Sequence, residues 1–144
     1  MTEIFFYILE DASADAPTHF ACRLTEKAHG EGHRVFIHVA DDEQADALDR
    51  QLWLFRQGSF VPHAQANDMT ADDDLTPVVI GTGQPPAGFD DVLINLAGEV
   101  GGFFSRFARH NEIVPPTAVA DARQRYRFFK DRGYALTTHK IPGR

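Results

Sequence analysis

The most constraining feature of this sequence is a series of short runs, rich in apolar and β-branched residues, that alternate with stretches of helical periodicity. The first run, Ile-Phe-Phe-Tyr-Ile-Leu, covers residues 4–9, and others follow at 34–39, 77–80 and 91–96. A fifth extended segment, 111–116, ends in two prolines. A continuous apolar run has no polar face, which is typical of a strand covered on both sides, as in a parallel sheet.

Two of the intervening segments carry the spacing of amphipathic helices. The first ends near Gly30 and Gly32, and the second begins at Asp41 and Asp42, whose side chains can cap a helix N-terminus. The apolar positions are Phe20, Leu24 and Ala28 in the first helix and Ala45, Leu48 and Leu52 in the second. Each helix is therefore expected to pack one face against the sheet.

Strands that alternate with helices form right-handed crossover units around a parallel sheet. We predict a single three-layer, Rossmann-like α/β domain over residues 1–144, with a mostly parallel sheet of about five strands. Residues 58–76 are polar and irregular, and 134–141 form a last extended tail. The chain has one cysteine, no run long enough to span a bilayer and no basic start typical of a signal peptide, so we expect a cytoplasmic protein.

The charge of the chain is distributed unevenly. The net charge of −7 argues against general affinity for nucleic acids. Residues 1–105 contain 5 Lys and Arg against 18 Asp and Glu, whereas residues 106–144 contain 9 against 3. The first part therefore carries −13 and the second +6. This division predicts a basic surface on an acidic body, suited to an acidic partner or a nucleic acid.

The loop after the first run argues against a nucleotide site. A dinucleotide fingerprint needs glycines there, because backbone N–H groups at the start of the next helix bind the phosphate. Residues 10–17 contain no glycine, and Glu10, Asp11 and Asp15 would repel phosphate. The Gly-Thr-Gly at 81–83 lacks the third glycine and a following helix start.

Other candidate catalytic groups are equally weak. The seven histidines do not form the helical pair around a glutamate that marks a zinc protease. The aspartates at 72–74 lack the ligand spacing of a calcium loop. Cys22 resembles an inert filler, and Ser13, Ser59 and Ser105 lie outside any Gly-x-Ser-x-Gly elbow. We therefore expect no catalytic site, no metal and no cofactor in this chain.

A third helix is predicted over residues 117–133, with Thr117 as its cap and Gly133 as its end. Its apolar stripe is Val119, Ala122, Tyr126 and Phe129. Its basic residues form two rows, one of Arg123, Arg127 and Lys130 and another of Arg125 and Arg132.

Arg123 borders the apolar stripe, since it lies four residues after Val119 and three before Tyr126. A guanidinium beside an aromatic group suits a carboxylate attached to a hydrophobic side chain. The alternative is a solvated basic flank on an ordinary core helix, which amphipathic helices often carry. Trp53 follows the stripe of the second helix by one residue, and it fits either a partly buried core position or a binding hot spot.

Five segments follow one another along the chain: Phe-Phe-Tyr-Ile-Leu-Glu-Asp at the start, 34–53, Ser-Phe-Val-Pro-His, 91–100, and Ile-Val-Pro-Pro followed by 122–134. In this order and spacing they resemble the chi subunits of bacterial DNA polymerase III holoenzyme. The resemblance runs along nearly the whole chain. It implies a Rossmann-like protein that is not an enzyme. It also implies binding to the acidic C-terminal tail of single-stranded DNA-binding protein, which ends in a phenylalanine with a free carboxylate.

The resemblance further implies a psi subunit as the link to the clamp loader, so that the protein would reach DNA only indirectly and act in the cytoplasm at the replisome. In this interpretation Arg123 binds the terminal carboxylate, while Val114 and Tyr126 help to form the wall of the phenylalanine pocket. The residues that the resemblance assigns to the tail are Trp53, Val114, Arg123, Tyr126, Arg127 and Lys130. The psi surface is placed around Phe60, Pro62 and His63, and no function is assigned to 64–76 or 81–90.

The sequence alone leaves two alternatives from other functional classes open. One is a degenerate nucleotide-binding protein, which the glycine-free first loop disfavours. The other is direct binding of nucleic acid through the basic helix, with Arg125 and Arg127 as the contacts. The −13 body disfavours this second alternative, because it repels phosphate.

Overall fold

A seven-stranded parallel sheet organises the chain in a computed structural model that describes residues 1–55, 61–69 and 76–143. The order of the strands across the sheet is β3-β4-β2-β5-β6-β1-β7, and every pairing found among them is parallel. The strands are β1 (Glu3–Leu9), β2 (Val35–His38), β3 (His63–Gln65), β4 (Val78–Gly81), β5 (Val92–Asn95), β6 (Arg109–Val114) and β7 (Leu136–Ile141).

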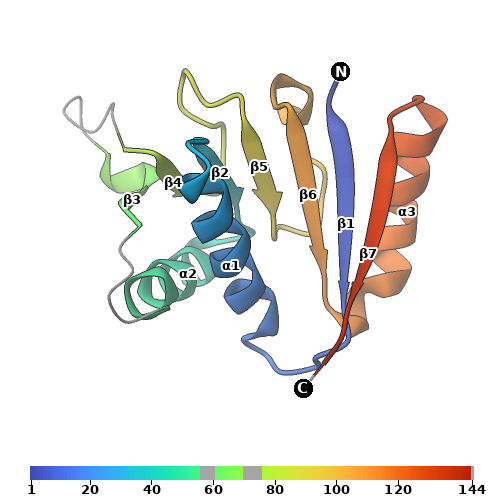
Figure 1. Ribbon diagram of the computed structural model, residues 1–144, viewed down its shortest axis with the longest axis horizontal. Helices are drawn as coiled ribbons and strands as arrows, with labels where there is room; N and C mark the ends of the chain where they lie inside the picture. The colour runs from blue at the N-terminus through green and yellow to red at the C-terminus, as the bar shows by residue number, and fades with distance from the viewer. Residues whose placement is uncertain (56–60, 70–75, 144) are drawn as a thin grey trace.

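Three α-helices cover the two faces of the sheet (Figure 1). Helices α1 (Ala16–Gly30) and α2 (Asp42–Leu54) pack on one face, over a core that includes Phe20, Leu48 and Val35. Helix α3 (Val119–Asp131) packs on the other face, over a core that includes Phe6. The predicted three-layer α/β class is therefore confirmed.

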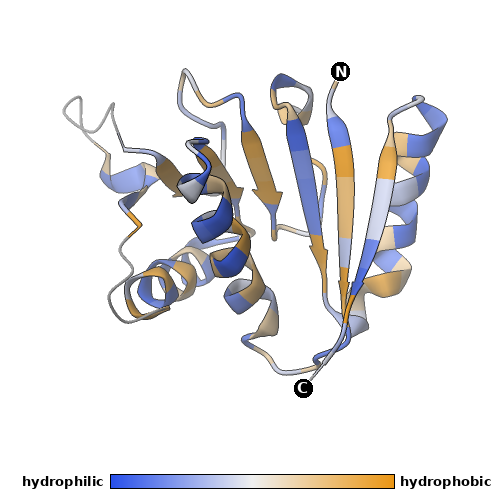
Figure 2. Ribbon diagram, viewed as in Figure 1, coloured by the Kyte–Doolittle hydropathy of each residue, from blue (hydrophilic) through white to orange (hydrophobic). Residues whose placement is uncertain are grey.

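The central strands of the sheet correspond to the continuous apolar runs in the sequence. All four residues of β2, of β4 and of β5 are buried, as expected for strands covered on both faces. Figure 2 shows these strands largely in the hydrophobic colour, whereas most of β6 is hydrophilic although it lies between β5 and β1.

The prediction of about five strands was too low. Strand β7 adds to the edge of the sheet beside β1, and β3 adds to the other edge beside β4. β3 is three residues long and only partly buried, and it lies in the stretch expected to be irregular. An edge strand of this kind is made by backbone pairing alone, so it leaves no apolar pattern in the sequence.

The helix ends show one wrong prediction and two correct ones. Asp41 caps α2, since its side chain accepts a hydrogen bond of 2.8 Å from the Gln44 amide. Gly133 ends α3 with a φ of 80°, a conformation that suits glycine. Thr117 does not cap α3, because it lies inside a 3₁₀ turn, Pro116–Ala118, that the Pro115 carbonyl closes through the Ala118 amide.

No helix in the described part of the chain has the length and apolar character needed to cross a bilayer. The single cysteine, Cys22, is fully buried in the core under α1. Burial raises the pKa of its thiol to about 12, so the thiol stays protonated at neutral pH, as expected for an inert filler.

Candidate functional site

The outer side of α3 presents a row of cations with a partly buried aromatic ring. Arg123, Arg127 and Lys130 are exposed, and none of the ion pairs or side-chain hydrogen bonds found among the described residues involves them. Tyr126 is half-buried beside them. The structure therefore brings these four predicted residues onto one helix, and the three charges are available to a partner.

Tyr126 anchors this row to the sheet. Its ring packs edge-on against Phe6 of β1, with 5.5 Å between the ring centroids. Val114, at the end of β6, belongs to the same core cluster and has no exposed surface. Val114 therefore offers no exposed surface to a ligand, whereas the half-buried Tyr126 does.

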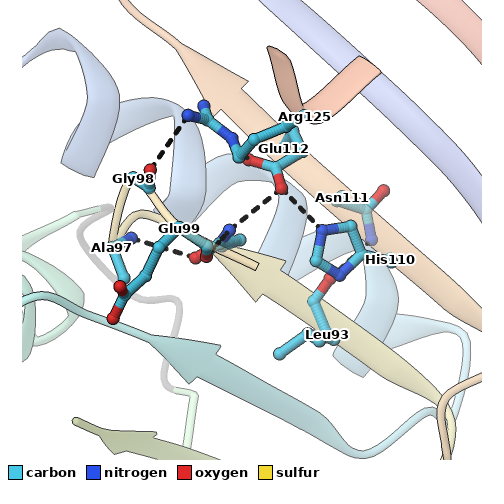
Figure 3. A network of polar contacts seen from close by, with 9 residues as sticks. Leu93, Ala97, Gly98, Glu99, His110, Asn111, Glu112 and Arg125 are labelled. Carbon is cyan, nitrogen blue, oxygen red and sulfur yellow. Dashed lines mark hydrogen bonds and ion pairs between the residues drawn. The ribbon is translucent and has the colours of Figure 1, made fainter. Parts of the chain in front are cut away.

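Arg125 does not belong to the solvated flank in which the sequence pattern placed it. It is one of three residues that α3 buries, with Ala122 and Phe129. Its Nε donates to Glu112 Oε1 at 3.1 Å, and its Nη1 donates to the Gly98 carbonyl at 3.0 Å (Figure 3). The alternative of nucleic-acid binding through Arg125 therefore loses one of its two contacts.

Glu112 is the centre of a buried polar network at the carboxyl end of β5 and β6. Its Oε2 accepts from His110 Nε2 at 2.8 Å and from Asn95 Nδ2 at 3.0 Å. Asn95 also donates to the Glu99 carbonyl and accepts from the Ala97 amide, so all of its amide hydrogens and its oxygen are used. The loop after β5 is thus fixed to the neighbouring strand.

The charge state of this network follows from its partners. Burial by itself would raise the pKa of Glu112, but the hydrogen bonds from His110 and Asn95 and the charge of Arg125 hold the pKa below its ordinary value of 4.5. Glu112 is therefore ionised at neutral pH, and Arg125 balances it. His110 is fully buried, and its Nδ1 has no hydrogen-bond partner among the described residues.

His38, another buried histidine, lies close to this network. Burial lowers its pKa, so the ring is neutral at pH 7. Its ring packs edge-on against Phe103 at 5.1 Å, and its Nδ1 also lacks a partner in the described structure. Both rings are parts of a packed interior and are not open to a substrate.

The structure does not bring Trp53 to α3. Trp53 lies at the end of α2, which packs on the opposite face of the sheet beside β3 and β4. α3 lies at the β7 edge on the other face (Figure 1). The sequence-based grouping of Trp53 with Arg123 and Tyr126 therefore joins residues from two separate surfaces.

Trp53 instead joins the segment that the sequence suggested for a second partner. Trp53 is 55% exposed, and its indole packs on the His63 ring with 4.7 Å between centroids. The His63 side chain has no exposed surface, and its Nε2 lies 2.7 Å from Asp49 Oδ1. Pro62 is half-buried, and Phe60 lies outside the described residues. His63 thus supports Trp53 from below, while Trp53 and Leu54 are the exposed apolar groups.

The region where a Rossmann-like protein would bind phosphate has the wrong chemistry. A groove of about 650 Å³ lies at the carboxyl end of β1, but its lining includes Glu10, Asp11 and Asp15. Gly81, from the Gly-Thr-Gly segment, lies inside β4, where a Cβ would come within 3.1 Å of the Phe36 ring. This glycine serves close packing, and the acidic groove repels phosphate.

No group of three histidine, cysteine, aspartate or glutamate side chains suited to a metal ion occurs in residues 1–55, 61–69 and 76–143. The aspartates at 72–74 lie outside the described residues. The sequence pattern missed Asn95, His110 and Glu112, and it placed Arg125 on the solvated flank. The signal that could have found them is the polar run Arg-His-Asn-Glu at 109–112, directly before the apolar end of a strand.

Comparisons with known proteins agree on one family. A family model described as "DNA polymerase III chi subunit, HolC" matches residues 1–137. The DNA polymerase III subunit chi of Pseudomonas aeruginosa is 40% identical over 144 residues, 99% of each chain. The proteins of the same name from Haemophilus influenzae and Escherichia coli are each 30% identical, over 94% and 96% of this chain and 95% and 97% of their own.

Proposed function

The chain belongs to the family of DNA polymerase III chi subunits, and we propose that it is a non-catalytic adaptor that binds the acidic C-terminal tail of single-stranded DNA-binding protein through α3. The observation that carries this proposal is the row of three exposed cations beside Tyr126, none of which has an ion-pair partner among the described residues. In a chain of net charge −7, such a row is the natural place for an acidic segment.

In this proposal each residue of the row has its own task. The Arg123 guanidinium binds the terminal carboxylate through two parallel hydrogen bonds, a geometry that lysine cannot reproduce. The phenylalanine ring of the tail packs on Tyr126, with Val114 beneath. Arg127 and Lys130 attract the aspartates that precede it. A short peptide buries little surface, so we expect a dissociation constant near 1 μM, or about −8 kcal/mol.

The second surface, with Trp53 and Pro62 supported by His63, is our proposed site for the psi subunit, which would link the protein to the clamp loader in the cytoplasm. Trp53 and Leu54 are exposed apolar groups at the end of an acidic helix. Exposed tryptophan is the side chain most typical of binding hot spots. Because this surface lies on the opposite face of the sheet from α3, both partners could bind at once.

The tail proposal is tested by calorimetric titration with a peptide that ends in Asp-Phe. Arg123→Ala is expected to weaken binding about tenfold to a hundredfold, since a hydrogen bond to a charged group contributes about 1.5–3 kcal/mol. Trp53→Ala is the matched control at the other surface and should leave the affinity unchanged. The proposal is wrong if a peptide with an amidated C-terminus binds as tightly as the free acid.

Two further measurements test the alternatives of nucleic-acid binding and nucleotide binding. An oligonucleotide that binds tightly at moderate salt, and loses binding with Arg127→Ala, would favour direct nucleic-acid binding. A thermal shift with ATP would favour a nucleotide site, against the acidic groove at β1.

A further inference from the structure

The buried ion pair between Glu112 and Arg125, beneath α3, affects how α3 presents the proposed tail site. We propose that Arg125 is a positioning residue: with Glu112 and the Gly98 carbonyl it fixes the rotation of α3 about its axis, so that Arg123, Tyr126 and Arg127 face the tail. This inference rests on the proposed function and adds to it a residue that does not touch the ligand.

The helix geometry connects the two sides of α3. Successive residues of an α-helix are separated by about 100°, so a residue two positions away points in nearly the opposite direction. Arg123 and Arg127 are each two positions from Arg125. Whatever sets the direction of Arg125 therefore sets the direction of both exposed arginines.

Arg125 is held at two points that belong to different elements. One contact goes to Glu112 on β6 and the other to Gly98 in the loop after β5. A planar guanidinium that donates in two directions resists rotation more than one contact would. Glu112 is itself held by His110 (Figure 3) and by Asn95, so the anchor on the sheet side has little freedom.

The other contacts of α3 with the body of the protein are mainly apolar and not directional. Its N-terminus has no side-chain cap. Apart from Arg125, the only residues that it buries are Ala122 and Phe129, whereas α1 buries six. Three partly buried residues also pack against the same core: Val119, Tyr126 and Phe128. These apolar contacts define where the helix lies, but they limit its rotation less than the two directional contacts of Arg125 do.

The experiment compares two double variants that both keep the net charge. Glu112→Gln with Arg125→Met removes the buried pair, and the amide oxygen introduced at position 112 can still accept from His110 and Asn95. Glu3→Gln with Arg109→Met is the matched control, since these exposed residues are register partners on β1 and β6. Each variant is titrated with the Asp-Phe peptide at several salt concentrations, and its fold is checked by circular dichroism and thermal unfolding.

We expect the buried-pair variant to fold and to bind the peptide roughly 2- to 30-fold more weakly than wild type. The salt dependence of its binding should equal that of wild type, because all three exposed cations remain. The control should bind like wild type. Peptide affinity within twofold of wild type in a folded buried-pair variant would overturn the inference and leave the pair a purely structural role.

Arg125→Lys decides the matter if the double variant does not fold, because it keeps the charge opposite Glu112 but cannot make both contacts. Weaker peptide binding by this folded variant supports the inference, and wild-type binding overturns it. A wild-type protein that does not bind the peptide at all would instead refute the proposed function, so the two failures are distinguishable.

Discussion

The helices at the two ends of the sheet each carry an aromatic side chain, but their charges are of opposite sign. α2, at the β3 end, carries four acidic residues and one arginine, while α3, at the β7 end, carries four basic residues and two acidic ones. Each helix places an aromatic side chain, Trp53 or Tyr126, beside its charges. The two proposed surfaces therefore share an aromatic group and differ in the sign of the surrounding charge, which is expected to select the partner.

The ends also differ in how their charges are held. At the α3 end, a fully buried glutamate compensates Arg125, whereas Arg123 is exposed and has no ion pair with any described residue. At the α2 end, Asp49 is partly exposed and contacts the His63 ring that supports Trp53. One end therefore depends on an enclosed ion pair, and the other on a contact open to water.

The largest expected difference between the ends is in stability. Arg125→Met should lower the free energy of unfolding by about 3–5 kcal/mol, because it leaves the Glu112 carboxylate buried without its compensating charge. Asp49→Asn at the other end should cost about 0–1 kcal/mol, since the carboxylate is partly exposed and the amide can still accept. Urea denaturation followed by circular dichroism measures both, and equal costs would contradict the comparison.

A smaller effect is expected in the pH dependence of stability. The pKa of Glu112 lies below 4.5 in the folded state, so its stabilising effect is complete above that pH and is lost as the pH falls through the folded value. Glu112→Gln should be less stable than wild type at pH 7 by about 1.5–3 kcal/mol. The difference should shrink as the pH falls below about 4.5, and a constant difference from pH 7 to pH 3 would show that the charge of Glu112 does not matter.

The smallest effect concerns the outer charges. Arg127→Ala should weaken binding of the Asp-Phe peptide by about 0.2–1 kcal/mol, and the loss should diminish as salt is added. Asp46→Ala on α2 removes a charge of opposite sign at the other end and should change the affinity less. If the two variants shifted peptide affinity by the same amount in opposite directions, net charge and not the α3 surface would control binding.

Much of the fold could be predicted because burial on both faces leaves a visible pattern. β2, β4 and β5 read as continuous apolar runs, and Asp41 and Gly133 mark helix ends by their own chemistry. β3 could not be found in this way, since an edge strand is defined by backbone pairing. The prediction that Thr117 caps α3 was wrong because the two prolines before it impose a tight turn.

The candidate site was predictable only in part. The helical spacing placed Arg123, Tyr126, Arg127 and Lys130 on one side of α3, because residues three and four apart on a helix are neighbours. The same spacing gave Arg125 no special place. Its burial depends on Glu112, thirteen residues away on a strand, and on Gly98, in a loop more distant still.

By itself, the sequence determined the α/β class, the parallel sheet and the family, because these depend on local periodicity and on the order of motifs along the chain. Only the tertiary structure decided that Trp53 and Arg123 lie on different surfaces and that Arg125 is enclosed. The physical reason is that the connections between parallel strands can place successive helices on either face of the sheet, as they place α2 and α3. Which side chains meet is therefore set by strand order and packing, which local sequence patterns do not encode.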